Sequence, residues 1–178
     1  YDIFGTGHAA TSLSAALGIA KARDLNKEKF TVVSVIGDAS ISSGESFEAI
    51  NNVHSVKGPF VIILNDNEMS ISSSVGVLSD HITSLRSNLL YRGLKKKAEK
   101  IMMLLPRVGG PLVKSVDKLI RRTKHILINY EKVGVIYEEL GLRYLGPLDA
   151  SNIPLIMGAV LYAKQAKEPV LIHVISTK

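Results

Sequence analysis

The chain has 178 residues, of which 46% are apolar, and it carries a formal net charge of +6. This length is enough for one globular domain with a buried core. There is no cysteine, which excludes disulfide bonds and thiolate metal sites, and no apolar run approaches the roughly 18 residues that a membrane-spanning helix needs. The first residue is Tyr1 rather than methionine, so we expect the chain to be a piece of a longer protein.

The predicted secondary structure alternates helices with short strands. A helix is expected over residues 10–25, where Leu13, Leu17 and Ala20 share one face. Apolar, β-branched runs predict strands at residues 31–36, 60–64 and 170–174, with a weaker candidate at 142–145, and helical patterns cover residues 44–56 and 153–166. Uninterrupted apolar strands are typical of parallel sheets buried on both faces. The predicted fold class is therefore α/β: a doubly wound, mostly parallel sheet with helices on both faces.

Residues 79–130 interrupt this alternation, since they contain no strand candidate and are rich in Leu, Ile, Lys and Arg. We expect a helical insertion of at least two helices, within a single but incomplete domain that spans residues 1–178. Residues 86–124 hold twelve Lys or Arg side chains and two acids. Because Tyr91 is the only aromatic residue there, a solvated helical face is favoured over a nucleic-acid-binding surface. A membrane-surface role is favoured less still.

Polar side chains follow two of the predicted strands. Asp38 comes one glycine after residues 31–36, and the run NDNEMS at residues 65–70 follows residues 60–64. Because neighbouring parallel strands end at the same edge of a sheet, we expect Asp38 and this run to lie side by side, where their oxygens would suit Mg²⁺. Each feature alone has a simpler interpretation. Asp38 can be an N-cap of the next helix, and the Asn-Asp-Asn run can be a turn bonded to its own backbone.

The sequence resembles the 1-deoxy-D-xylulose-5-phosphate synthases, a family of transketolase-like, thiamine-diphosphate-dependent enzymes. One part of the resemblance is Gly37-Asp38 with Asn67 placed 29 positions after the aspartate. Longer stretches occur in the family's order and span nearly the whole chain, and the family has a helical insertion at the corresponding place. These stretches are GTGHAATSLSAALGIAKARD (5–24), VIGDASISSGESFEAINN (35–52), VIILNDNEMSIS (61–72), YEELGLRYLGPLD (137–149) and PVLIHVISTK (169–178).

The resemblance implies an N-terminal domain that binds the diphosphate of thiamine diphosphate through Mg²⁺. Asp38 and Asn67 would offer side-chain oxygens to the metal, and Met69 would offer its backbone carbonyl. Backbone N–H groups at a helix start would meet the phosphates, and a Gly-His stretch would lie near the diphosphate or the reacting centre. The implied cofactor-binding residues are Gly7, His8, Ala9, Ala39, Ser40 and Asn67.

The reaction implied by the resemblance condenses pyruvate with D-glyceraldehyde 3-phosphate and releases CO₂, giving 1-deoxy-D-xylulose 5-phosphate. It would serve isoprenoid and thiamine biosynthesis in a homodimer, in the bacterial cytoplasm or the plastid stroma, with no nucleic-acid partner and no membrane span. No residue of this chain is assigned a catalytic role. The histidines other than His8 show no metal-ligand spacing and are expected to be structural or solvated: His54, His81, His125 and His173.

Several positions depart from the family's wording. Ala39 replaces the second glycine of the family's GDG, which matters if that position needs a positive φ. Ala9 and Ala10 replace the serines of GHSS, and Ser151 replaces a histidine. The family's remaining cofactor contacts would lie outside residues 1–178, so this stretch alone is not expected to turn over substrate. The alternative is a non-catalytic binding module, or a split transketolase-like subunit that needs a partner chain.

Overall fold

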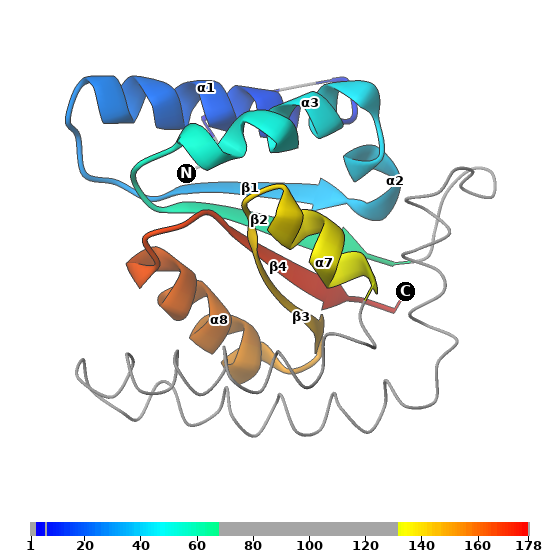
Figure 1. The fold of residues 1–178 in the computed structure, drawn as a ribbon. Helices are drawn as coiled ribbons and strands as arrows, with labels where there is room; N and C mark the ends of the chain where they lie inside the picture. The colour runs from blue at the N-terminus through cyan, green and yellow to red at the C-terminus, as the bar shows by residue number, and fades with distance from the viewer. Residues whose placement is uncertain (1–2, 6, 68–131, 178) are drawn as a thin grey trace.

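The computed structural model describes residues 3–5, 7–67 and 132–177. Their strands form one parallel sheet in the order β1-β2-β4-β3 (Figure 1). The strands are β1 (Val32–Gly37), β2 (Phe60–Asp66), β3 (Arg143–Asp149) and β4 (Val170–Ile175). The helices are α1 (Ser12–Leu25), α2 (Asp38–Ile41), α3 (Gly44–Asn52), the 3₁₀ helix η1 (Val53–Ser55), α7 (Lys132–Glu139) and α8 (Ile153–Gln165). The predicted insertion at residues 79–130 lies outside the described residues.

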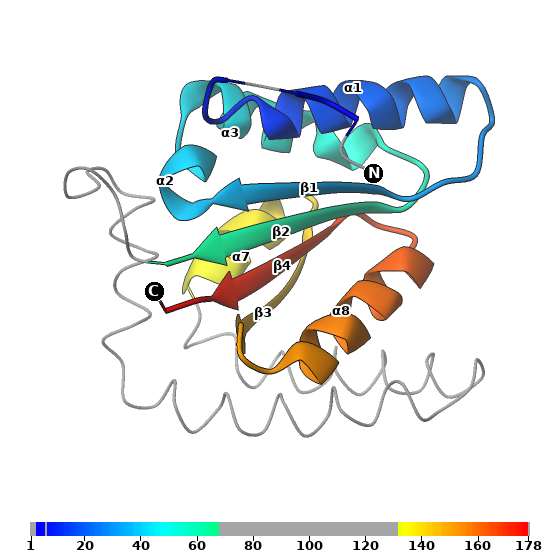
Figure 2. The same ribbon diagram turned by 180° about the vertical axis from the view of Figure 1, so that it is seen from behind.

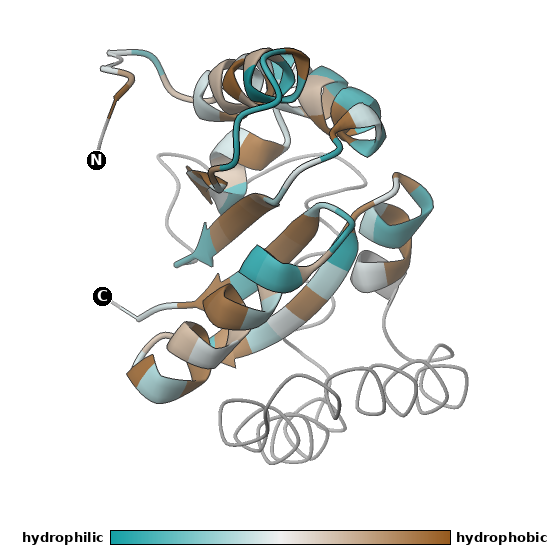
Figure 3. Ribbon diagram, turned by 90° about the vertical axis from the view of Figure 1, so that its left-hand side faces the viewer, coloured by the Kyte–Doolittle hydropathy of each residue, from teal (hydrophilic) through white to brown (hydrophobic). Residues whose placement is uncertain are grey.

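Helices cover both faces of the sheet (Figures 1 and 2). On one face, α1, α3 and α7 enclose a core that includes Leu13, Phe60 and Tyr137. On the other face, α8 encloses a second core that includes Leu155 and Ile172. Strands β1, β2 and β4 are largely hydrophobic (Figure 3). None of the described helices is long and apolar enough to cross a membrane. The predicted doubly wound α/β fold is confirmed.

Strand β1 differs from the prediction because it is buried on one face only. Val32, Ser34 and Ile36 are buried, whereas Val33 and Val35 are 47% and 62% exposed. Helix α8 packs on β2, β3 and β4, whereas β1 lies at the edge of the described sheet that is far from β3. An apolar run predicts a strand but does not reveal its place in the sheet, so burial on both faces was the wrong expectation here.

The element bounds differ from the prediction for local reasons. Helix α1 begins at Ser12 rather than at residue 10, because Ala10 has a left-handed backbone (φ +72°) that a right-handed helix cannot include. Strands β2 and β3 run further than predicted because Asp66 and Asp149 still pair with Ile175 of β4. Helices α2 and α7 were not predicted; α2 has only four residues, too few to show a helical period.

Removal of the Tyr137 hydroxyl, on helix α7, is expected to stabilise the fold. The Tyr137 ring stacks on Tyr144, with 6.3 Å between ring centroids. Its buried hydroxyl has no hydrogen-bond partner in the part of the chain that the structure describes, and burial raises the pKa of Tyr137. An unpaired buried hydroxyl costs about 1–3 kcal/mol. Tyr137→Phe should therefore raise the free energy of unfolding by about 1 kcal/mol, as measured by chemical denaturation.

Tyr144→Phe is the matched control for this change. The Tyr144 hydroxyl lies 2.6 Å from Nδ1 of His173, so its removal breaks a hydrogen bond and should lower stability. A Tyr137→Phe variant that is no more stable than the parent protein would contradict the prediction.

Candidate functional site

Parallel pairing brings the ends of the strands to one edge of the sheet (Figure 2). Gly37 of β1 is in register with Asn65 of β2. Asp38 follows β1 directly, and Asn67 follows β2 directly. Because β1 and β2 are neighbours, Asp38 and Asn67 lie at adjacent strand ends on the same edge of the sheet.

Asp38 is the first residue of the short helix α2, which packs against both β1 and β2. The N-cap position of this helix is Gly37, without a side-chain cap, so the simpler interpretation of Asp38 as an N-cap is wrong. The carboxylate is half-buried. Ala39 and Ser40 belong to α2, and Ala39 therefore has a right-handed helical backbone in which its methyl group causes no strain. The replacement of glycine by Ala39 is thus tolerated.

The residues after the predicted second strand do not form a turn. Asn65 and Asp66 are the last residues of β2. The Asn65 side-chain oxygen accepts a hydrogen bond from the Ser176 hydroxyl at 2.8 Å, and the Asp66 carbonyl accepts one from the Ser176 N–H at 2.9 Å. The interpretation of these two residues as a self-bonded turn is therefore wrong. Asn67 is half-buried, and Met69 lies outside the described residues.

The start of α1 is anchored at the same edge of the sheet. The Ser12 hydroxyl donates to the carbonyl of Val35 in β1 at 3.4 Å. The buried Ser46 hydroxyl of α3 donates to the carbonyl of Ala10 at 2.9 Å. These contacts place residues 10–12, which follow residues 7–9 directly, close to β1 and the start of α3. Residues 7–9 are all exposed: Gly7, His8 and Ala9.

The donor set at this edge fits magnesium by its chemistry. Asp38 offers carboxylate oxygens and Asn67 offers an amide oxygen, both from half-buried side chains. Mg²⁺ prefers such hard oxygen ligands and commonly takes only one or two protein carboxylates, with phosphate oxygens and water completing its octahedron. Within residues 3–5, 7–67 and 132–177, no group of three or more His, Asp or Glu side chains could hold a metal. The edge therefore suits a metal that is shared with an anionic ligand.

Comparison with known proteins identifies the family. The family model described as 1-deoxy-D-xylulose-5-phosphate synthase matches residues 1–176. The chain belongs to this family. It is 43% identical over 178 residues to the 1-deoxy-D-xylulose-5-phosphate synthase of Natranaerobius thermophilus, and 42% identical over the same length to that of Caldanaerobacter subterraneus subsp. tengcongensis. The chain is covered completely in both comparisons and spans 28% of each relative's length.

A solved structure shows the same fold. It is a Mycobacterium smegmatis protein assigned as a thiamin diphosphate-dependent enzyme, with a TM-score of 0.51 and 18% sequence identity. The likeness covers 97% of this chain and 23% of that protein. At this identity it supports the fold alone, which agrees with the family to which the chain belongs.

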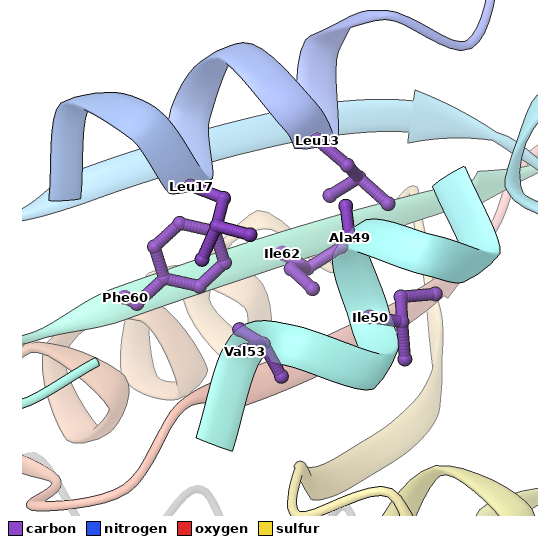
Figure 4. Close-up of a pocket in the computed structure, with 7 residues that line it drawn as sticks. All are labelled: Leu13, Leu17, Ala49, Ile50, Val53, Phe60 and Ile62. Carbon is purple, nitrogen blue, oxygen red and sulfur yellow. The ribbon is translucent and has the colours of Figure 1, made fainter. Parts of the chain in front are cut away.

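An apolar hollow between α1, α3 and β2 lies within the core of this 1-deoxy-D-xylulose-5-phosphate synthase family member (Figure 4). Ligand sites combine apolar walls with a few polar groups that orient the ligand, and the lining of this hollow has none. Its lining residues are Leu13, Leu17, Ala49, Ile50, Val53, Phe60 and Ile62. We therefore interpret it as a packing seam of the core.

A buried polar network beside the strand ends was missed in the sequence. Asp66 is completely buried and His173 is 2% exposed. Nε2 of His173 lies 3.0 Å from Oδ2 of Asp66, and Nδ1 of His173 lies 2.6 Å from the Tyr144 hydroxyl. Of the two expected roles, structural or solvated, the buried position and the two hydrogen bonds of His173 favour the structural one. The available signal was a histidine inside an otherwise apolar strand, VLIHVI.

Proposed function

We propose that this chain forms the diphosphate-binding part of an enzyme that condenses pyruvate with D-glyceraldehyde 3-phosphate. The products would be 1-deoxy-D-xylulose 5-phosphate and CO₂. The chain spans 28% of the length of these relatives, so this activity would belong to the complete protein. That protein would act as a homodimer in isoprenoid precursor synthesis. The observation that carries the proposal is the position of Asp38 and Asn67 at adjacent strand ends in a member of this family.

Asp38 and Asn67 would hold Mg²⁺ through their side-chain oxygens, and Met69 would add its backbone carbonyl. The metal would neutralise the diphosphate and fix its orientation. The remaining coordination positions would go to diphosphate oxygens and water. The support for this assignment is the oxygen chemistry of the two half-buried side chains and their shared edge of the sheet.

The start of α1 and the short helix α2 would hold the anionic end of thiamine diphosphate. Backbone N–H groups of Ala39 and Ser40 would donate to phosphate oxygens, and the exposed side chain of His8 would offer a ring N–H to the same group. Gly7 and Ala9 flank His8 and would let the backbone approach the cofactor. When bound, thiamine diphosphate supplies the carbon nucleophile and the electron sink that decarboxylation of pyruvate needs.

The alternative, a non-catalytic or split subunit, rests on the departures from the family's wording. Two of them have local explanations in the structure. Ala39 has a helical backbone, and the Ser151 hydroxyl and N–H both donate to Oδ1 of Asp149, at 2.7 and 3.0 Å. The mass of the expressed protein separates these proposals, because about 19.3 kDa is the mass of this chain alone, whereas the enzyme would be several times larger.

The metal assignment predicts a specific loss in an Asp38→Asn variant. With excess thiamine diphosphate and Mg²⁺ at 100 times their dissociation constants, mass action should stabilise the complete parent protein by about 2.7 kcal/mol. Asp38→Asn should lose most of this stabilisation, because a neutral amide is a weaker magnesium ligand than a carboxylate. Thermal unfolding with and without both ligands measures the effect.

Glu48→Gln supplies the control, because it makes the same change of charge at an exposed residue of α3. It should keep the full ligand-induced shift. If the parent protein folds and shows no shift, the proposed function fails. If both variants keep the shift, Asp38 is not a metal ligand.

A further inference from the structure

Three side chains from three strands form a continuous hydrogen-bonded chain inside the sheet. Tyr144 lies on β3, His173 on β4 and Asp66 on β2, and these strands are neighbours in that order. Their side chains are 5%, 2% and 0% exposed. This hydrogen-bond network extends from Tyr144 in the core to Asp66, the last residue of β2. None of the three residues is a ligand in the proposed metal site.

The direction of these hydrogen bonds follows when Asp66 is assigned as ionised and His173 as neutral. An ionised carboxylate can only accept, so Nε2–H of His173 then donates to Oδ2 of Asp66 over 3.0 Å. In the neutral imidazole the other ring nitrogen is an acceptor, and it receives the Tyr144 hydroxyl over 2.6 Å. The Tyr144 ring also lies edge-on to the His173 ring, with 5.9 Å between centroids. The position and tautomer of His173 are thereby set from both sides.

Asp66 is the residue directly before Asn67, and it is held on two sides. Its side chain is held by His173, and its carbonyl accepts the Ser176 N–H at 2.9 Å. With Asp66 fixed in this way, the start of the segment that carries Asn67 is fixed too. Ligands that are held in place before the metal arrives bind it more tightly, and groups outside the coordination sphere commonly provide this support.

We propose that His173 is a positioning residue that orients Asn67, and so the Mg²⁺ site, by holding Asp66 from within the sheet. This inference rests on the proposed function, since it needs Asn67 to be a metal ligand. Its physical basis is the cost of breaking the network. A buried carboxylate that loses the hydrogen bond from Nε2 of His173 must rearrange around its remaining contacts, and at the end of β2 that rearrangement would displace the neighbouring Asn67.

Two substitutions of His173 separate positioning from general stability. Glutamine can place its amide nitrogen where Nε2 of histidine lies, so His173→Gln keeps the bond to Asp66 and loses the bond to Tyr144. Asparagine is shorter and places its amide near the position of Nδ1, so His173→Asn keeps Tyr144 and loses Asp66. Both variants replace one buried polar side chain by another, and each leaves one of the two partners without its original contact.

The readout is the affinity of the complete protein for Mn²⁺, which accepts the same hard ligands as Mg²⁺, measured by electron paramagnetic resonance with saturating thiamine diphosphate. His173→Asn should weaken Mn²⁺ binding by about 10- to 100-fold, the usual loss when an outer support of a metal site is removed. His173→Gln should keep most of the affinity. Equal affinities in the two folded variants would overturn the inference.

A further variant covers the case in which His173→Asn does not fold. Replacing Asp66 and His173 by leucine and Tyr144 by phenylalanine removes the three polar groups of the network together, and concerted replacements of this kind are often neutral for stability. The triple variant should also lose Mn²⁺ affinity, and parental affinity in it would overturn the inference. A parent protein that binds no Mn²⁺ with thiamine diphosphate would refute the proposed function itself.

Discussion

Replacing Arg23 by methionine should lower the free energy of unfolding by about 3–5 kcal/mol, the usual cost of breaking a buried ion pair from one side. Arg23 is 1% exposed although it carries a full charge. Its guanidinium pairs with Asp24 at 2.9 Å and donates to the carbonyls of Phe30 at 3.0 Å and Pro59 at 2.6 Å. It therefore joins the end of α1 to the segments that lead into β1 and β2.

The expected effect is large because several groups lose their partners at once. Asp24 is 12% exposed and also accepts the N–H groups of Lys57 at 2.7 Å and Gly58 at 3.2 Å. Without Arg23, this largely buried carboxylate would keep the two backbone N–H groups but lose the positive charge that compensates its own. The guanidinium also packs closely against Gly58, because a Cβ at that position would lie 2.5 Å from the Arg23 guanidinium carbon.

Arg143→Met provides the control for Arg23→Met. Arg143 is also buried, at 7% exposure, but its ion pair is with Glu168, which is 42% exposed and can return to water. Chemical denaturation should therefore show a clearly smaller loss for Arg143→Met. Equal losses would show that the carbonyl and carboxylate partners of Arg23 are not the cause.

The contribution of the Arg23–Asp24 pair should depend on pH. Burial raises the pKa of Asp24, but the hydrogen bonds from the Lys57 N–H and Arg23, and the charge of Arg23, outweigh it and hold the pKa below its usual value. A carboxyl group whose pKa is lowered by folding stabilises the protein above its unfolded pKa of about 4 and loses that contribution as the pH falls further. The stability difference between the parent and Arg23→Met should therefore shrink below about pH 4.

The sheet and the edge that carries the candidate site could both be predicted from the sequence. The β-branched apolar runs appear as β1, β2 and β4, and in β2 and β4 they are buried between helical layers, as is typical of parallel sheets. The rule that ligands lie beyond the carboxyl ends of strands then points to Asp38 and the run at residues 65–70, and within that run the family resemblance selects Asn67. Each of these inferences needs only local sequence.

What could not be predicted depends on contacts between distant segments. Asp66 and His173 are 107 positions apart, and only the placement of β4 beside β2 brings them together. The edge position of β1 depends on the same strand order, which no local pattern encodes. Arginine in a helix is usually exposed, so the sequence gives no sign that Arg23 is buried. Its burial depends on a contact with a distant segment, the hydrogen bond to the carbonyl of Pro59.

Gly146→Ala should destabilise the protein by at least about 2 kcal/mol, because two independent constraints act on this position. Gly146 has φ +146°, a backbone conformation open to glycine and strained for other residues. A Cβ there would also lie 2.6 Å from the carbonyl oxygen and 2.9 Å from the Cβ of His173. The carbonyl oxygen is part of the backbone of β4, so relief of the clash requires the strands to separate.

The position of Gly146 in the sheet explains why the chain cannot adapt easily. The pairing of β3 with β4 shifts register between Leu145 and Leu148, and Gly146 passes His173 within this irregular stretch. Moving β3 outward would pull Tyr144 from His173 and weaken the buried network that ends at Asp66. Gly146→Ala should therefore lower Mn²⁺ affinity as well as stability, whereas Arg23→Met, at the opposite end of the sheet, should affect stability alone.

Gly18→Ala is the control for Gly146→Ala, because it makes the same chemical change with the opposite expected sign. Gly18 lies inside helix α1, and a Cβ there would meet nothing within 4 Å. Alanine in a helix interior is favoured over glycine by about 1 kcal/mol, so this variant should be more stable than the parent. Chemical denaturation of both variants measures the pair. Equal shifts in the same direction would show that the close approach of β3 to His173 does not constrain the fold.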